Sequence, residues 1–136
     1  MTPPVWNPTP SGAGSFKKSI LVIDDNQDIL FIVRTMLEEN GYEVNCASTG
    51  PEGLKCVQTL PPDLIILDIL MPDMDGMEVL KTIKESPDTS SIPVMVLSAK
   101  IKSKDIEGGY RAKADYYMTK PFTSAQLING ISLVIG

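Results

Sequence analysis

Three short apolar runs, each closed by a polar side chain, constrain the fold of this chain more than any other feature. The runs cover residues 20–23, 64–67 and 94–97, and they end in Asp24-Asp25, Asp68 and Ser98. Continuous apolar runs of this length are typical of strands that are buried on both faces of a parallel sheet. Ligands bind where the carboxyl ends of such strands meet. The sequence therefore predicts one sheet edge that carries three acids and a hydroxyl.

The rest of the chain alternates between strand and helix patterns. Strands are predicted at 19–24, 42–47, 64–68, 93–98 and about 115–118, and each pair is separated by a single stretch with helical spacing. Strands joined by single helices require right-handed crossovers and a parallel sheet. We therefore predict an α/β fold, a doubly wound five-stranded parallel sheet with helices on both faces.

Helix boundaries can be predicted from capping signals. Thr49 is placed to cap a helix whose apolar face carries Leu54, Val57 and Leu60, and Asp75 is placed to cap the next helix. The last helix should open with a capping box, since Thr123 and Gln126 have the required spacing. A fourth helix should begin near Ser103, and Gly108-Gly109 weaken it by roughly 1 kcal/mol per glycine.

The N-terminal residues differ in composition from the rest. Residues 1–18 contain Pro3, Pro4, Pro8 and Pro10 followed by a Ser/Gly/Ala stretch, and we expect a flexible tail because this composition buries little apolar area. Residues 19–136 are expected to form the folded domain. Trp6 is the only tryptophan. It is either a docking anchor or an exposed residue with no fixed role, and the composition favours the second.

Composition limits the partners and the location. A length of 136 residues is enough for one buried core. The net charge of −5 means that the chain lacks the surplus of Lys and Arg that binding to nucleic acid or anionic lipid requires. No stretch is long enough to span a bilayer and the N-terminus lacks a secretion signal, so we expect a cytoplasmic protein that does not bind a membrane. Cys46 and Cys56 are too few for a disulfide framework, and we expect two reduced thiols.

The absence of histidine narrows the chemistry. No His is present in the 136 residues, which excludes serine-type triads and a phosphohistidine carried by this chain. Asp24, Asp25 and Asp68 would repel one another at one sheet edge unless a hard cation neutralised them. Mg²⁺ suits such a set of carboxylates, with Mn²⁺ or Ca²⁺ possible in its place. Three unrelated surface acids are the alternative, which is credible for each residue alone.

Two further strand ends add donors at the same edge. Lys120 follows the fifth predicted strand and Ser98 ends the fourth, so an ammonium and a hydroxyl join the acids. Together with a metal they would form a receptacle for a phosphoryl group, which indicates transfer to the Asp68 carboxylate. Taken singly, Lys120 could equally be a solvated charge, and Ser98 a cap or turn residue.

These elements together resemble the response regulator receiver domain of two-component signalling. The resemblance rests on Asp24-Asp25, on Leu67-Asp68 with Met71-Pro72 and Asp75-Gly76, on Ser98-Ala99, and on residues 117–122, Tyr-Met-Thr-Lys-Pro-Phe. It spans residues 19 to about 134. Four motifs in order, each after its own strand, make a specific match. The resemblance implies a flavodoxin-like strand order, 2-1-3-4-5.

The resemblance also implies roles for individual residues. Asp68 matches the phosphoacceptor, and the metal ligands would be Asp24, Asp25, Asp68 and the backbone carbonyl of Leu70. Lys120 matches the lysine that pairs with the phosphoryl group and Ser98 the switch hydroxyl. Tyr117 matches the aromatic switch residue, and the Lys120-Pro121 peptide bond would be cis.

Partners follow from the same resemblance. The phosphoryl donor would be a sensor histidine kinase or a phosphotransfer protein, since this chain has no His. The readout would be the surface of the fourth helix, fifth strand and last helix, acting on an output partner or a missing effector domain, with a homodimer through that surface also possible. The protein would not be an enzyme in the usual sense, although it would catalyse its own phosphorylation and slow autodephosphorylation.

Three positions depart from the family pattern, and they bear on the competing function classes. Leu70 and Lys100 lie two residues after Asp68 and Ser98, where side chains modulate dephosphorylation, and Lys113 replaces a usual glycine. Leu70 cannot orient water, so we expect slow autodephosphorylation. A phosphatase of the haloacid-dehalogenase type would need an Asp two residues after the nucleophile as its general acid, and Leu70 occupies that position. The main alternative is a receiver-like interaction module that acts without phosphorylation.

Overall fold

The computed structural model describes residues 17–68, 70–71, 74–98 and 114–136. Their elements are β1 (Ser19–Ile23), α1 (Gln27–Glu39), β2 (Glu43–Ala47), α2 (Gly50–Thr59), β3 (Leu64–Leu67), β4 (Leu70–Met71), β5 (Met74–Asp75), α3 (Gly76–Glu85), β6 (Val94–Ser98), β7 (Tyr116–Thr119) and α5 (Ser124–Ile135). The expected helix from Ser103 and nearly all of the expected tail lie outside the described residues.

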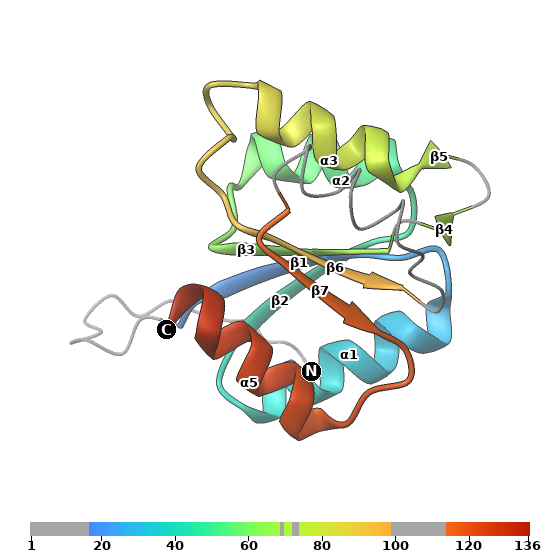
Figure 1. Cartoon of the computed structure of the whole chain (residues 1–136), viewed down its shortest axis with the longest axis vertical. Coiled ribbons are helices and arrows are strands. Elements are labelled where there is room, and N and C mark those ends of the chain that lie inside the picture. Colours follow the sequence, from blue (N-terminus) through green and yellow to red (C-terminus); the bar gives the residue numbers. More distant parts are fainter. Residues whose placement is uncertain (1–16, 69, 72–73, 99–113) are drawn as a thin grey trace, which may run out of the picture.

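The predicted sheet is confirmed. Five parallel strands run in the order β2-β1-β3-β6-β7, which is 2-1-3-4-5 when the strands of this sheet alone are counted. Helices α2 and α3 cover one face, and α1 and α5 cover the other (Figure 1). The described helices alternate with the strands of this sheet as the doubly wound arrangement requires.

Strand alternation divides the core into two layers. In β1, Leu21 and Ile23 pack toward α2 and α3, while Ile20 and Val22 pack toward α1 and α5. All four of these side chains are buried, as are the four residues of β3. This two-sided burial is the reason that both runs are apolar at every position.

Most capping predictions are confirmed. Thr49 caps α2, accepting the Glu52 N–H at 3.2 Å, and Thr123 forms a capping box with Gln126 at the start of α5. Gly41, just after α1, has a φ of +88°, the left-handed conformation that ends many helices. Asp75 immediately precedes α3 but lies in β5, and its side chain is outside the described part of the chain.

Two features differ from the expectations. Leu60 was predicted on the buried face of α2, but it follows the last helical residue as the C-cap and is 63% exposed. The helix ends at Thr59, so Leu60 leaves the periodicity that would have turned it inward. The short antiparallel pair β4–β5 was not predicted, because two-residue strands carry no periodic signal.

Cys46 and Cys56 are free thiols. Among the described residues, no helix is both long and apolar enough to cross a membrane.

Candidate functional site

The register of the sheet brings the predicted acids to one edge. Ile23 of β1 lies opposite Leu67 of β3, so Asp24 and Asp68 leave neighbouring strands at the same level. The Asp68 N–H donates to the Ile23 carbonyl at 2.9 Å, and the Asp24 N–H donates to the Ala47 carbonyl at 3.1 Å. Backbone hydrogen bonds of this kind hold both residues at the ends of core strands.

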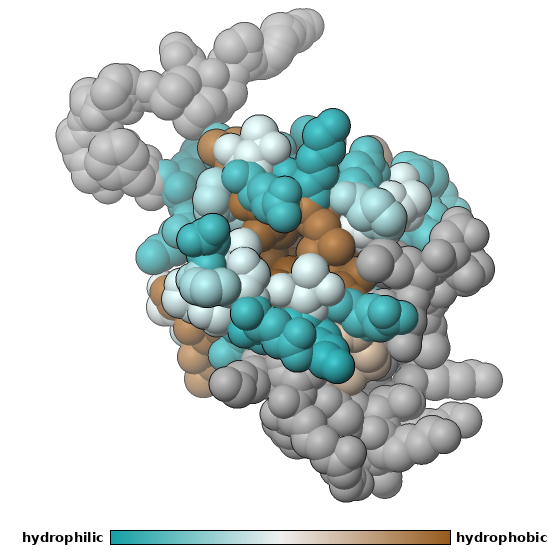
Figure 2. Space-filling model, turned by 90° about the horizontal axis from the view of Figure 1, so that it is seen from above, coloured by the Kyte–Doolittle hydropathy of each residue, from teal (hydrophilic) through white to brown (hydrophobic). Residues whose placement is uncertain are grey.

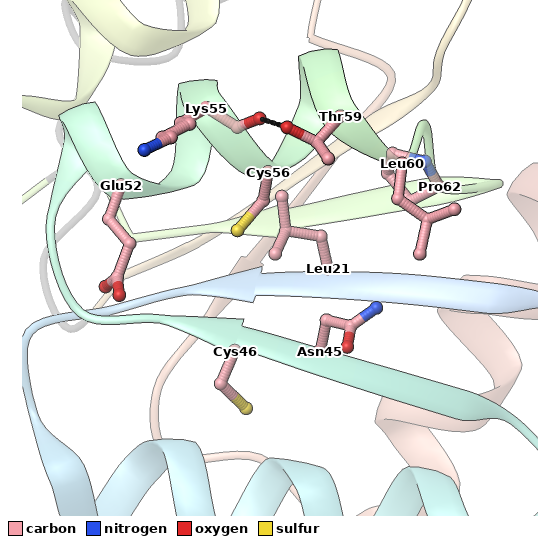
Figure 3. A pocket seen from close by; sticks show the side chains of 9 residues that line it. All are labelled: Leu21, Asn45, Cys46, Glu52, Lys55, Cys56, Thr59, Leu60 and Pro62. Atoms are coloured by element: carbon pink, nitrogen blue, oxygen red, sulfur yellow. Dashed lines mark hydrogen bonds between the residues drawn. The ribbon is translucent and has the colours of Figure 1, made fainter. Parts of the chain in front are cut away.

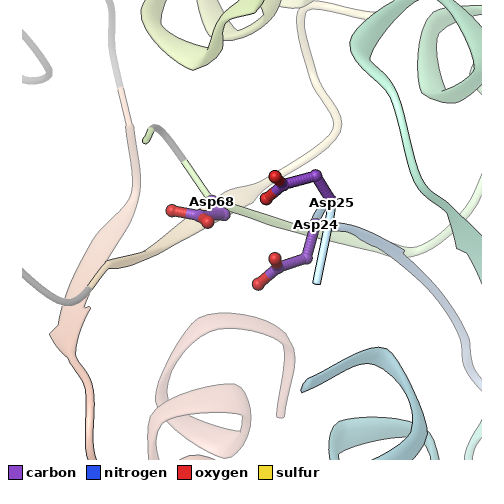
Figure 4. A group of neighbouring side chains, drawn as sticks. All are labelled: Asp24, Asp25 and Asp68. Atoms are coloured by element: carbon purple, nitrogen blue, oxygen red, sulfur yellow. The ribbon is translucent and has the colours of Figure 1, made fainter. Parts of the chain in front are cut away.

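The three carboxylates form one cluster. Oxygens of Asp24, Asp25 and Asp68 lie within 4.8 Å of one another. In Figure 4 the three side chains, from the ends of β1 and β3, turn their carboxylates toward the same side. Asp24 is 2% exposed and Asp68 is 6% exposed, whereas Asp25 is exposed. The cluster therefore has a buried floor and one open carboxylate.

Lys120 supplies the positive charge next to this cluster. Its ammonium lies 2.8 Å from Asp24 Oδ2 and 3.5 Å from Asp68 Oδ2. The Lys120 N–H donates to the Ser98 carbonyl at 2.8 Å, which attaches the start of the loop after β7 to the end of β6. The Lys120-Pro121 peptide bond is cis, as the resemblance implied.

Asn26 is a site-forming residue that the sequence analysis missed. Its N–H donates to Asp24 Oδ1 at 2.9 Å, while its own side chain caps α1 by accepting the N–H groups of Asp28 and Ile29. Both oxygens of Asp24 are thus engaged, one by Asn26 and one by Lys120. An Asn directly before a helix is a capping signal, and this signal could have revealed Asn26 in the sequence.

The structure places Ser98 and Tyr117 on adjacent strands. Ser98 ends β6, is fully buried and lies opposite Thr119, while Tyr117 lies opposite Val96. Tyr117 is half-buried against the core layer beneath α2 and α3, with its hydroxyl oxygen buried. Ser98 therefore lies at the sheet edge with the acids, and Tyr117 lies two residues further back along the strands.

Two positions named in the sequence analysis, Leu70 and Lys100, are described only in part or not at all. The backbone of Leu70 lies in β4, but its side chain is outside the described part of the chain, as is all of Lys100. The role of the Leu70 carbonyl as a ligand stays a prediction.

The donor set fits a hard divalent cation. Three carboxylates offer only oxygen atoms, and one of them is open to solvent, which suits Mg²⁺ because this ion retains several waters in its octahedral shell. Lys120 already neutralises part of the buried charge of Asp24 and Asp68. Chemically, the arrangement places a buried carboxylate and an ammonium beside a group of acids suited to a divalent cation, and these are parts that phosphoryl transfer uses.

Solved structures with the same fold come from bacteria and an archaeon. The chemotaxis protein CheY4 of Vibrio cholerae is 29% identical, with a TM-score of 0.84 over 87% of this chain and 98% of that chain. A CheY-like receiver domain protein of Methanospirillum hungatei is 30% identical, with a TM-score of 0.82 over 86% of this chain and 92% of that chain.

Sequence relatives lead to the same family. The alkaline phosphatase synthesis transcriptional regulatory protein PhoP of Bacillus subtilis is 41% identical over 110 residues, which are 81% of this chain and 45% of that protein. A probable transcriptional regulatory protein of Picosynechococcus is 38% identical over 84% of this chain and 47% of that protein. This chain spans about half the length of these curated relatives. The family described as the response regulator receiver domain matches residues 20–132, and the chain belongs to that family.

Proposed function

We propose that this receiver domain takes a phosphoryl group from a phosphohistidine of a partner protein onto Asp68. The observation that carries the proposal is the contact of Lys120 with Asp24 and Asp68, at 2.8 and 3.5 Å, beside a three-carboxylate cluster. A lone surface acid would have neither an ammonium nor two further carboxylates around it. The donor would be a sensor histidine kinase or a phosphotransfer protein.

The transfer balances with the residues present. An Asp68 carboxylate oxygen attacks phosphorus, the O–P bond forms as the N–P bond breaks, and the electron pair stays on the imidazole nitrogen of the partner. Lys120 lies close enough to both acids to pair with the arriving phosphoryl oxygens and so offset the charge that builds up. This chain has no His, so the phosphohistidine of the proposed donor lies outside these 136 residues.

Mg²⁺, or Mn²⁺ or Ca²⁺ in its place, fits the acidic cluster. Asp24, Asp25 and Asp68 would hold it, with the Leu70 carbonyl as a further ligand implied by the family. When bound, the ion would neutralise carboxylate and phosphoryl charge. Asp25, the exposed member of the cluster, is the ligand open to the solvent from which an ion arrives.

Phosphorylation would then change one surface. The added charge and acceptor oxygens at Asp68 would draw Ser98 and Lys120 toward them, and Tyr117 would move into the space that Ser98 leaves. The responding surface would include β7, α5 and the helix expected from Ser103, and it would act on an output partner, a further domain or a second copy. A cytoplasmic location, with self-catalysed phosphorylation and slow autodephosphorylation, is part of the same proposal.

Intact-protein mass spectrometry after incubation with acetyl phosphate and Mg²⁺ tests this function. We expect the mass of one phosphoryl group to be added to the wild type and to be absent in Asp68→Asn. Asp88→Asn, a matched change at an exposed acid away from the cluster, should be phosphorylated like the wild type.

The outcomes separate the two function classes. A wild type that gains no phosphoryl group from acetyl phosphate or from a phosphohistidine donor would indicate an interaction module that acts without phosphorylation. Phosphorylation that persists in Asp68→Asn would assign the acceptor to another residue and contradict the proposal.

A further inference from the structure

Strand β7, which carries Tyr117 and leads into Lys120, has an ion pair at each of its ends. It is a four-residue strand at the edge of the sheet, next to β6. At its carboxyl end, Lys120 contacts the acidic cluster. At its amino end, the residue directly before the strand, Asp115, pairs with Lys84 of α3, with 3.1 Å between Oδ2 and Nζ. The first pair belongs to the proposed phosphoacceptor site, whereas the second lies outside it.

The Lys84 ammonium is enclosed by oxygen atoms. It donates to the Ile92 carbonyl at 2.5 Å and to the Ser90 carbonyl at 3.3 Å, and it pairs with the Asp115 carboxylate. The Lys84 side chain is only 7% exposed. A buried charge is costly unless it is paired and hydrogen-bonded, and an ammonium has three N–H donors to satisfy. The three acceptors supply these partners and so hold the end of the side chain in one position.

The surroundings of α3 do not require this lysine to be buried. Figure 2 shows that the face over α2 and α3 is mostly hydrophilic, and Lys81, three residues earlier on α3, is exposed. A lysine on such a helix can extend its ammonium into water while its stem stays on the surface. Lys84 instead turns toward the start of β6 and β7, where its ammonium connects α3 to both strands.

The loop between α3 and β6 is folded around this ammonium. Thr89 is buried, and its hydroxyl donates to the Ile83 carbonyl at 2.6 Å. The Ile92 N–H donates to the Thr89 carbonyl at 3.0 Å. The Ser90 N–H donates to the Ser86 carbonyl at 2.8 Å. Bonds within the loop therefore hold the two residues whose carbonyls accept from the ammonium.

Asp115 attaches the start of β7 to the start of β6. Its N–H donates to the Val94 carbonyl at 2.9 Å. Its Oδ2, the same oxygen that pairs with Lys84, accepts the Val94 N–H at 2.8 Å. Hydrogen bonds and ion pairs depend on direction, whereas apolar contacts do not and let neighbouring groups slide. The amino end of β7 is therefore fixed relative to both β6 and α3.

The other edge strand of the sheet, β2, is attached differently. Within the part of the chain that the structure describes, no ion pair includes a residue of β2. A hollow of about 460 Å³ lies between β2 and α2, and Figure 3 shows the Lys55 ammonium of α2 pointing away from Asn45 of β2. Both strands lie at an edge of the sheet. Of the two, the strand with an ion pair at each end is the one that carries Tyr117.

We propose that Lys84 and Asp115 are positioning residues for the switch, an inference that rests on the proposed phosphorylation of Asp68. When Lys120 moves toward the phosphoryl oxygens, the carboxyl end of β7 is displaced. The Lys84–Asp115 pair keeps the amino end in place, so the displacement is taken up between the two ends, at Tyr117. Without the pair, the short strand would shift as a whole, and the surroundings of Tyr117 would change less.

Two-dimensional NMR of the full chain, with beryllofluoride and Mg²⁺ as the probe, tests this role. Asp115→Asn removes the charge that pairs with Lys84 and keeps the size of the side chain. In this variant the change in the Lys120 amide shift on adding the probe should equal that of the wild type, whereas the change at Tyr117 should be several-fold smaller. Lys84→Met should give the same result. Lys81→Met, at an exposed position on the same helix, is the matched control and should respond like the wild type at both amides.

The outcomes distinguish a positioning role from a structural one. A wild-type response at Tyr117 in Asp115→Asn would overturn the inference even if the variant unfolded at a lower urea concentration, because the pair would then only stabilise the fold. A response lost at Lys120 as well would also overturn it, since the pair would then act on the site and not on β7. If Lys84→Met fails to fold, Asp115→Asn decides alone, because the Asp115 side chain is 41% exposed.

Labelling with acetyl phosphate separates this inference from the function on which it rests. Wild type, Asp115→Asn and Lys81→Met should all gain the mass of one phosphoryl group to the same extent. Equal labelling together with an undiminished Tyr117 response in Asp115→Asn would overturn the positioning role and leave the proposed function intact. A wild type that neither gains the mass nor responds to beryllofluoride at Lys120 would overturn both.

Discussion

The Lys120 ammonium lies closer to Asp24 than to Asp68, at 2.8 Å against 3.5 Å. The lysine therefore makes its closer contact with Asp24 and not with Asp68, the proposed phosphoacceptor. Asp24 is in turn fixed by the Asn26 N–H. The ammonium thus stays next to Asp68, although its closer contact is with Asp24. Removal of the lysine should therefore affect both acids.

Lys120→Met should destabilise the protein in the absence of metal. Asp24 and Asp68 are 2% and 6% exposed, and loss of the ammonium leaves their charges uncompensated. Breaking a buried pair in this way costs about 3 kcal/mol in the free energy of unfolding, which urea unfolding monitored by circular dichroism would measure. Lys81→Met, at an exposed position on α3, should change the free energy by much less. Equal effects of the two substitutions would contradict the importance of the pair.

Mg²⁺ should stabilise the folded protein through the acidic cluster. Binding to the native state alone adds about 2.7 kcal/mol at a hundredfold excess over the dissociation constant, seen as a higher melting temperature that EDTA reverses. Asp25→Asn should abolish this shift and slightly raise the metal-free melting temperature, because it removes one of three repelling carboxylates. Asp88→Asn serves as the control. A Mg²⁺ shift retained in Asp25→Asn would rule out this site.

Phosphorylation or a beryllofluoride mimic should move residues on β6 and β7 as well as the acidic cluster. Amide chemical shifts of Ser98, Tyr117 and Lys120 should change more than those of Asn45 on β2, because the Lys120 backbone is bonded to Ser98. Two-dimensional NMR of the labelled protein provides the comparison. Changes confined to Asp24, Asp25, Asp68 and their immediate neighbours would argue against the proposed switch.

Leu70→Asn should shorten the lifetime of the phosphorylated protein. An apolar side chain cannot hydrogen-bond an attacking water, whereas an amide can orient one, so the loss of phosphate should be several-fold faster in the variant. The decay of the phosphorylated mass after removal of the donor measures the rate. Leu70→Ile keeps the site apolar and should decay like the wild type, and an unchanged or longer lifetime in Leu70→Asn would contradict the assignment.

The Cys46 thiol should ionise only at high pH. Burial raises its pKa above the ordinary value of 9.0 and Glu38 raises it further, while Arg34 opposes the shift. Since the thiolate is the reactive form, alkylation by iodoacetamide at neutral pH should be slow and should continue to increase as the pH rises past 9.0. Measuring the rate against pH in Cys56→Ser isolates this thiol. A rate that levels off below pH 9.0 would show a lowered pKa.

The sequence predicted the strands and the acids because both depend on short-range patterns. An apolar run that ends in Asp24 or Asp68 identifies a buried strand and its carboxyl end without any knowledge of its neighbours. Capping at Thr49 and Thr123 is equally local, since the hydrogen bonds join residues three apart. Asn26 carries the same kind of local signal, because its side chain caps α1 through the N–H groups of Asp28 and Ile29, two and three residues later.

Tertiary structure decided what depends on residues distant in the chain. Leu60 fits the apolar face of α2 by spacing, yet the helix ends one residue earlier and leaves it exposed. The choice of Lys120 between Asp24 and Asp68 depends on a contact across 96 residues, which no local pattern records. The sequence by itself thus determined which chemical groups reach the sheet edge, and only the packing of strands and helices decided which of them touch.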